Sequence, residues 1–190
     1  ITINASLAGV SHKPLSRHKI TYTVFENGKV EVNLSAKIRE DAYWLPRYGF
    51  EYVLPETSNE FTYYGNGPFE NYLDMCHAGY VGRFNSTADA EYVDYILPQE
   101  HGNHTAVKEL TIGDLTFKSE NMEINVSKYS SKALTEAEHI DELKADGYIH
   151  LRVDYKVSGI GSGSCGPLVD EKYRLSEKEI EFAYSFEPKN

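Results

Sequence analysis

Apolar and polar residues alternate along much of the chain, a period-two pattern that predicts β-strands with one buried face. The pattern is clearest in residues 1–8, 18–25 and 29–38, and Glu26-Asn27-Gly28 separates the last two. Asn-Gly favours the tight turns that join neighbouring antiparallel strands. We therefore expect the first part of the chain to form an antiparallel meander.

Similar patterns predict more strands further along, at 48–54, 60–64, 107–117 with a turn at Gly113-Asp114, 121–127, 147–157 and 178–186. Residues 70–102 follow neither the strand nor the helix period, which indicates either a long functional or interface-forming loop or a regular element that the pattern does not reveal. One amphipathic helix is predicted over 133–144, with Thr135 and Glu138 as its capping box.

Length and composition agree with a single all-β domain spanning residues 1–190. A chain of 190 residues buries about 70% of the surface that its unfolded form exposes. It contains 15 Tyr and 8 Phe, residue types that favour sheets, and shows neither internal repeats nor a linker. Periodicity does not distinguish a sandwich from a barrel.

The charge of the chain excludes some classes of binding partner, and its cysteine content indicates the cellular compartment. The net charge of −10 argues against nucleic acid and anionic membrane surfaces, which bind through Lys and Arg. Cys76 and Cys165 are too few for a disulfide framework, so we expect a reducing, cytoplasmic compartment. No apolar run reaches the ~18 residues of a membrane span. Because the chain starts on a strand-like segment without Met, we expect it to be cut from a longer protein.

The densest run of unusual residues is Tyr63 to Asp74, which holds two glycines, a proline, several aromatic rings and two carboxylates. Gly65 and Gly67 are expected to supply positive or otherwise unusual φ angles, and Pro68 fixes its own φ. The run predicts a rigid, irregular loop at the end of a strand. Aromatic and glycine-rich turns are common in all-β proteins, so a purely structural turn is the alternative interpretation.

The order of residues in this run resembles the Gly-x-Gly-Pro-x-Glu-Asn-Tyr signature of the C-terminal domain, or small chain, of lac-type β-galactosidases, which are glycoside hydrolases of family 2. Further segments resemble motifs of the same domain in the same order, namely Leu45–Phe50, Tyr95–Asn103, Asn125–Ser130 and Gly159–Pro167. The resemblance implies a large antiparallel β-sandwich, the galactose-mutarotase-like supersandwich. The motif that opens this domain in the family is not found here, so we expect the first strands of the domain to be missing.

The resemblance also implies an activity, the hydrolysis of terminal non-reducing β-D-galactose residues in β-galactosides. Retaining hydrolysis needs two carboxyl groups about 5 Å apart, and the family carries that pair on a separate (β/α)8 barrel domain. The pairs within this chain, Glu70 with Asp74 and Glu136 with Glu138, are better explained as loop and surface residues. We therefore expect no catalytic residue here, an inactive isolated chain, a barrel domain or large subunit as partner, and a homo-oligomeric parent enzyme.

The resemblance implies substrate contact in the glycine-rich segment 159–167, at Gly161, Ser164 and Cys165, because in the family this segment reaches into the barrel's active site and its Trp or Cys lines the galactosyl pocket. Glycines also let the backbone approach a ligand closely. A glycine turn with a small buried thiol is the alternative interpretation. A structural role, with an Arg–Glu contact that braces the loops, is expected for the remaining motif residues: Arg47, Gly67, Pro68, Glu70, Asn71, Tyr72 and Glu100.

No metal or other cofactor is expected in this chain, since any Mg²⁺ or Na⁺ of the parent enzyme would bind elsewhere. Glu100, His101 and His104 are ligand types for zinc, but no third nitrogen or sulfur ligand follows at a suitable spacing.

Two other classes of function remain open. A stand-alone carbohydrate-binding module would bind galactosides through aromatic stacking. A mutarotase-like epimerase would need its own acid and base, for example a His with a Glu.

Overall fold

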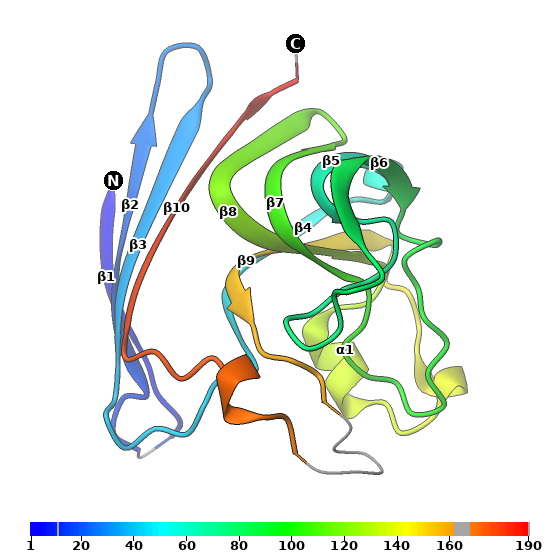
Figure 1. Cartoon of the computed structure of the whole chain (residues 1–190). Coiled ribbons are helices and arrows are strands. Elements are labelled where there is room, and N and C mark those ends of the chain that lie inside the picture. The colour runs from blue at the N-terminus through cyan, green and yellow to red at the C-terminus, as the bar shows by residue number, and fades with distance from the viewer. Residues whose placement is uncertain (11, 162–167, 190) are drawn as a thin grey trace.

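The computed structural model describes residues 1–10, 12–161 and 168–189 of the chain. Antiparallel strands dominate it, and one short α-helix lies in the last third of the sequence (Figure 1). The strands are β1 (Thr2–Leu7), β2 (Ser16–Val24), β3 (Val30–Ile38), β4 (Arg47–Pro55), β5 (Glu60–Gly67), β6 (Tyr80–Thr87), β7 (Asn103–Ile112), β8 (Leu115–Ser127), β9 (Tyr148–Val157) and β10 (Glu179–Pro188). The helix is α1 (Ser131–Glu136), and short 3-10 helices span Glu56–Ser58, Ile140–Glu142 and Glu171–Tyr173.

The strands form one branched sheet, and the branch lies at β8. The main path runs β1-β2-β3-β10-β8-β7-β5-β6. The first part of β8 pairs with β10, and its last part pairs with β9, which in turn pairs with β4. One long strand therefore belongs to two layers, and Figure 1 shows β1, β2, β3 and β10 on one side and β5 to β8 on the other.

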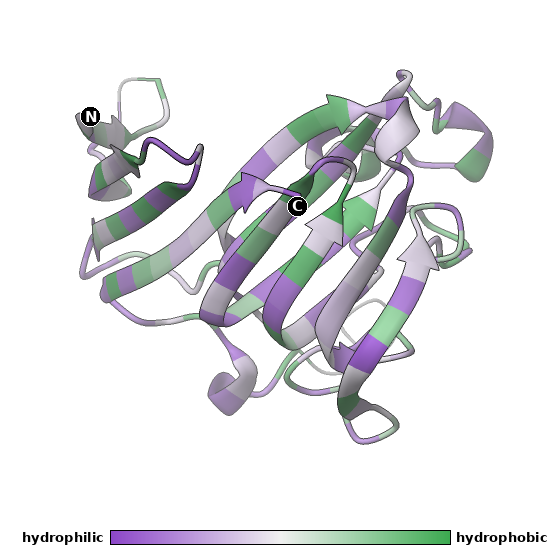
Figure 2. Ribbon diagram, turned by 90° about the horizontal axis from the view of Figure 1, so that it is seen from above, coloured by the Kyte–Doolittle hydropathy of each residue, from purple (hydrophilic) through white to green (hydrophobic). Residues whose placement is uncertain are grey.

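The core lies where β4 crosses the inner face of β10 and β8. The rings of Phe50 and Tyr184 are 5.7 Å apart, and those of Tyr52 and Phe117 are 5.6 Å apart, both edge to face. The hydroxyls of Tyr52 and Tyr184 share a hydrogen bond, and burial raises the pKa of Tyr52 to about 12. Strand residues alternate between this core and the outer faces, which gives the banded ribbons of Figure 2.

The predicted all-β sandwich with one short helix is confirmed. The hairpin at Asn27-Gly28 joins β2 to β3, and Gly28 has a φ of +83°, a conformation that glycine adopts without strain. Of the two interpretations left open for residues 70–102, a regular element is present in part, because β6 lies within this range and pairs along β5. The strands predicted at 107–117 and 121–127 are also redrawn, since 115–127 is the single strand β8.

The helix begins and ends earlier than predicted. Its N-cap is Ser130, whose hydroxyl accepts from the backbone N–H of Ala133, and Thr135 lies inside it. The chain leaves the helix at Ala137 in an extended conformation. The Glu142 carboxylate then accepts from the backbone N–H of Glu138, and Ile140–Glu142 forms a separate 3-10 helix. The one predicted helix is therefore two short helices.

Candidate functional site

The glycines of the signature run allow close packing. Neither Gly65 nor Gly67 has a positive φ, so the expectation of positive φ angles there was wrong. A Cβ on Gly65 would lie 2.6 Å from the Val107 side chain, and one on Gly67 would overlap the hydroxyl of Tyr63. Both glycines lie in β5, where only a residue without a side chain fits between neighbouring strands.

Asn71 ties the loop after β5 to the sheet. Its Nδ2 donates to the carbonyls of Asn66 and Phe69, at 3.0 and 2.9 Å. Its Oδ1 accepts from the backbone and the hydroxyl of Thr105, at 2.8 and 2.6 Å. Because one buried amide joins three backbone segments, the loop has little freedom to move.

Glu70 fixes the far end of the long excursion after β5. Its carboxylate accepts from the Tyr95 hydroxyl at 2.6 Å and from the Gly102 amide at 2.7 Å. Burial, together with the hydrogen bond to Glu70, raises the pKa of Tyr95 well above its usual range. Tyr95 therefore stays protonated and serves as a permanent donor.

Arg47, at the start of β4, lies between two carboxylates. It donates to Glu100 at 2.6 Å and to the buried carboxylate of Asp154 on β9. Burial alone would lower the pKa of Arg47, but the charges of Asp154 and Glu100 outweigh it and raise that pKa further. The Tyr72 hydroxyl donates to the other oxygen of Glu100, at 3.3 Å. An Arg–Glu contact thus joins the start of β4 to the segment before β7.

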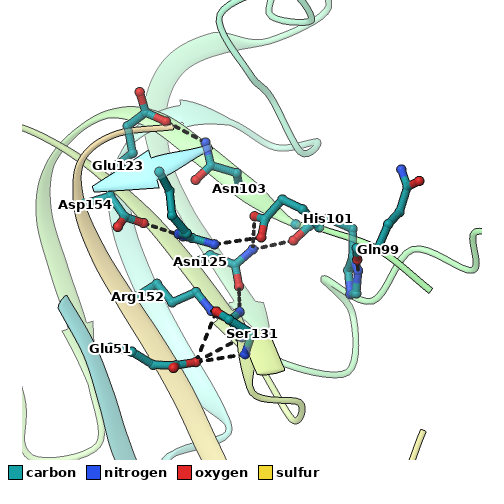
Figure 3. Close-up of polar contacts among 12 residues, drawn as sticks. Glu51, Gln99, His101, Asn103, Glu123, Asn125, Ser131, Arg152 and Asp154 are labelled. Atoms are coloured by element: carbon teal, nitrogen blue, oxygen red, sulfur yellow. Dashed lines mark hydrogen bonds and ion pairs between the residues drawn. The ribbon is translucent and has the colours of Figure 1, made fainter. Parts of the chain in front are cut away.

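A second arginine, Arg152, continues this network towards α1 (Figure 3). It is 1% exposed, and it donates to Asn125 Oδ1 at 2.5 Å, to the Ser131 hydroxyl at 2.7 Å and to the Tyr129 carbonyl at 2.6 Å. Glu51 lies 3.1 Å from the guanidinium. Asn125 accepts from Arg152 through its Oδ1, while its Nδ2 donates to Glu100 and to the backbone carbonyl of His101; Figure 3 shows Asn125 between Arg152 and His101.

Segments far apart in sequence therefore meet at one end of the sandwich. Comparison with known proteins shows to which family the chain belongs. The sequence profile described as β-galactosidase small chain matches residues 1–187. This chain belongs to the β-galactosidase small-chain family. It is 33% identical over 184 residues to a β-galactosidase of Actinobacillus pleuropneumoniae, covering 96% of this chain and 18% of that protein.

Other relatives give the same picture. A β-galactosidase of Staphylococcus xylosus is 33% identical over 190 residues, covering 97% of this chain and 19% of the relative. One of Kluyveromyces lactis is 33% identical over 170 residues, covering 86% and 16%. This small-chain domain thus spans less than a fifth of the length of the β-galactosidases that it resembles.

The residues expected to contact sugar lie only partly within the described structure. Ser164 and Cys165 lie outside it, whereas Gly161 is exposed at the end of the segment that follows β9. A cavity of about 250 Å³ lies beside that segment, and Trp44, Gln99, Glu100, Gly159 and Ile160 help to line it.

The small-chain domain carries several site residues that the sequence did not single out. Arg152, Asp154 and Glu123 occupy polar positions of alternating strands, which normally face water. The presence of Arg and Asp two residues apart on the same strand face is the one signal that could have indicated a buried ion pair there.

Among the residues with described positions, no group of three His, Cys, Asp or Glu side chains is arranged to hold a metal ion. His101 packs edge to face against Tyr92, while His104 bonds Glu91 and Tyr63 in the core. Nor does the described part of the chain contain a helix with the length and apolarity needed to cross a bilayer.

Proposed function

We propose that this domain forms one wall of the galactoside pocket of a larger β-galactosidase, which hydrolyses terminal non-reducing β-D-galactose residues. The substrate contacts come from the segment that begins at Gly159, and the catalytic carboxylates lie on another domain. The short share of the relatives' length that the chain covers supports this division, because most of the enzyme lies outside it.

One observation carries the proposal. The signature run, the segment around Glu100 and the start of the glycine-rich segment come together at one end of the sandwich, beside the cavity lined by Trp44. A rigid polar network holds these segments in place. Binding residues are commonly carried on loops that a rigid scaffold positions.

The hydrogen bonds of the carboxylates at this end of the sandwich support the proposal that the catalytic pair lies on another domain. Glu70 accepts from Tyr95 and Gly102, and Glu100 is held by Arg47. Asp74 accepts from two backbone amides of the glycine-rich segment. Carboxyl groups that are already committed to protein donors are poorly placed to act as nucleophile and acid in retaining hydrolysis. We therefore expect the isolated domain to be inactive.

An uncovered apolar face supports docking onto the rest of the enzyme. In β1, Ile3 pairs with Ile20 of β2, and Ile20 in turn pairs with Leu34 of the core, so these side chains share one face of the sheet. Ile3 and Leu7 are nevertheless 43% and 53% exposed. Burial of such a face is favourable by about 25 cal/mol per Å². We propose that it receives strands from the remainder of the enzyme's polypeptide, which would supply the first strands of the domain.

The alternative functions have less support. The shortest His–Glu contact between described residues, 2.9 Å from His104 to Glu91, is buried in the core with 1% and 8% of the side chains exposed. An epimerase would need such a pair to be open to its sugar. A carbohydrate-binding module would show lactose affinity in the isolated domain, which our proposal does not expect.

Activity measured with and without the domain tests the proposal. The parent enzyme without residues 1–190 should lose most of its activity on o-nitrophenyl galactoside, and the purified domain added back should restore part of it. The domain alone should show none. Equal activity of the shortened enzyme would refute the pocket role.

A further inference from the structure

Asp74 stands apart from the other carboxylates of the site because its partners are backbone amides of the glycine-rich segment. Its Oδ1 accepts from the Ile160 N–H at 3.2 Å, and its Oδ2 accepts from the Gly161 N–H at 2.7 Å. The two parts of the chain that meet here are more than 80 residues apart. Two adjacent amides on one carboxylate fix both the position and the direction of the backbone.

The approach is too close for a side chain at Gly159. A Cβ built on this residue would lie 2.5 Å from Cγ of Asp74 and 2.7 Å from both carboxylate oxygens. Such contacts are not tolerated by real side chains, so the backbone lies directly against the carboxylate because residue 159 is glycine. The Gly159 amide itself donates to the Tyr173 carbonyl at 2.8 Å, which holds it from the other side.

Asp74 is itself held rigidly. It lies in a tight turn closed by reciprocal backbone bonds between Tyr72 and Met75, at 3.1 and 2.9 Å. Tyr72 is fully buried, and its hydroxyl bonds Glu100, while Asn71 is bonded to the sheet. The signature run therefore holds the Asp74 carboxylate at a fixed position relative to the sheet.

The other end of the glycine-rich segment is fixed at the same place. Gly161 has a φ of +60°, and a Cβ on it would lie 3.1 Å from the backbone of Val169. The carbonyl of Val169 accepts from Nε of Arg174 at 2.8 Å. Gly161 and Val169 therefore lie against each other, and each is anchored by a hydrogen bond.

We propose that Asp74 is a positioning residue for galactoside binding: it fixes the backbone of Gly159 to Gly161, the part of the pocket wall that borders the cavity beside Trp44. The inference rests on the proposed function, in which this segment forms a wall of the galactoside pocket. Asp74 does not touch the sugar. It acts through the backbone of Gly161, so its loss weakens substrate binding more than the chemical step.

The test uses the whole parent enzyme with Asp74→Asn. The amide keeps the size of the side chain but opposes one backbone N–H with an NH₂ group. Since a hydrogen bond to a charged group contributes enough for about a tenfold change in affinity, we expect KM to rise about tenfold. The kcat should change less than about twofold.

Asp146→Asn is the matched control. Asp146 is an exposed aspartate that accepts from the Tyr148 amide at 3.1 Å just before β9, whereas Gly159 follows the end of that strand. A strand of this length places the two sites about 30 Å apart. The control should leave KM and kcat unchanged.

A second pair of variants keeps the proposal testable if Asp74→Asn folds poorly. Gly159→Ala should raise KM in the wild type by forcing the carboxylate away. In an Asp74→Ala background the same change should add less than about twofold, because the clashing atoms are gone. Additive effects of the two changes would contradict the inference.

A readout independent of sugar separates this inference from the proposed function. The rate at which iodoacetamide alkylates Cys165, followed on its peptide by mass spectrometry with Cys76 as reference, reports on the segment itself. A changed rate with a raised KM in Asp74→Asn supports both proposals. A changed rate with an unchanged KM supports the positioning role and refutes the pocket role. An unchanged rate overturns the positioning role, whatever KM does.

Discussion

Replacing Glu123 with glutamine should stabilise the domain at neutral pH. Glu123 lies on β8 with 4% of its surface exposed, and Asn103 donates to it at 2.8 Å. Burial, helped by the nearby charge of Asp154, raises its pKa from 4.5 to about 8 against the hydrogen bond from Asn103. The folded domain therefore holds a proton here at pH 7 that the unfolded chain has released.

The sign and size of the effect follow from proton linkage. Between pH 4.5 and about 8 the folded state binds more protons than the unfolded state, so the free energy of unfolding falls as pH rises. The stability that this group contributes is complete below pH 4.5 and is lost as pH rises through about 8. With these two pKa values, the loss between pH 5 and pH 7 is about 2–3 kcal/mol. Glutamine has no proton to lose, so Glu123→Gln removes the loss.

Urea unfolding of the domain at pH 5, 6, 7 and 8, followed by the fluorescence of Trp44, measures the effect. The advantage of Glu123→Gln over the wild type should grow by about 2–3 kcal/mol from pH 5 to pH 7. The control is Glu120→Gln on the same strand, where the carboxylate is exposed, and its advantage should not change with pH. If the advantage of Glu123→Gln is also independent of pH, Glu123 is ionised in the folded domain and the account of this buried network is wrong.

Two further changes test the packing and the docking face. Arg152→Ala should destabilise the domain by about 3–5 kcal/mol in urea unfolding, because it leaves Glu51 and Asn125 without their buried donor. As a control, Arg83→Ala, which removes an exposed ion pair with Glu109, should change stability by less than about 1 kcal/mol. Similar losses for both variants would contradict the buried network. Ile3→Glu should weaken association of the domain with the rest of the enzyme at least tenfold in a binding assay, because it places a charge on the face that we propose is covered. Asn4→Glu, on the opposite face of β1, should not, and equal binding by both variants would rule out this docking face.

Local patterns were sufficient for much of the fold. The hairpin between β2 and β3 follows from Asn27-Gly28, and alternation in the flanking strands defines the buried face. The strand β6 escaped prediction because it is an edge strand with exposed residues on both faces, which weakens the alternation. The helix was misplaced because Thr135 and Glu138 match a capping box in sequence, whereas the structure caps the helix at Ser130, and its first residue, Ser131, contacts Glu51 and Arg152, which are distant in sequence.

The site residues that lie within local sequence motifs could be predicted from the sequence. Arg47, Glu100 and Asn71 were singled out because they lie in recognisable segments, and the structure brings them to one end of the sandwich. Arg152 and Asp154 were not, because an alternating strand predicts that its polar side chains face water. Their burial depends on β9 pairing with β8 and on α1 covering that face, which are contacts between segments distant in sequence.

Shortening the glycine-rich segment in the parent enzyme tests the central claim most directly. Deletion of Gly161 to Ser164 removes two of the three residues that we expect to contact the galactoside, Gly161 and Ser164, and leaves the arginine network in place. The account predicts that KM for lactose rises at least tenfold while the enzyme stays folded and its unfolding midpoint shifts little. An unchanged KM in a folded enzyme would contradict it, and the domain would then serve assembly alone.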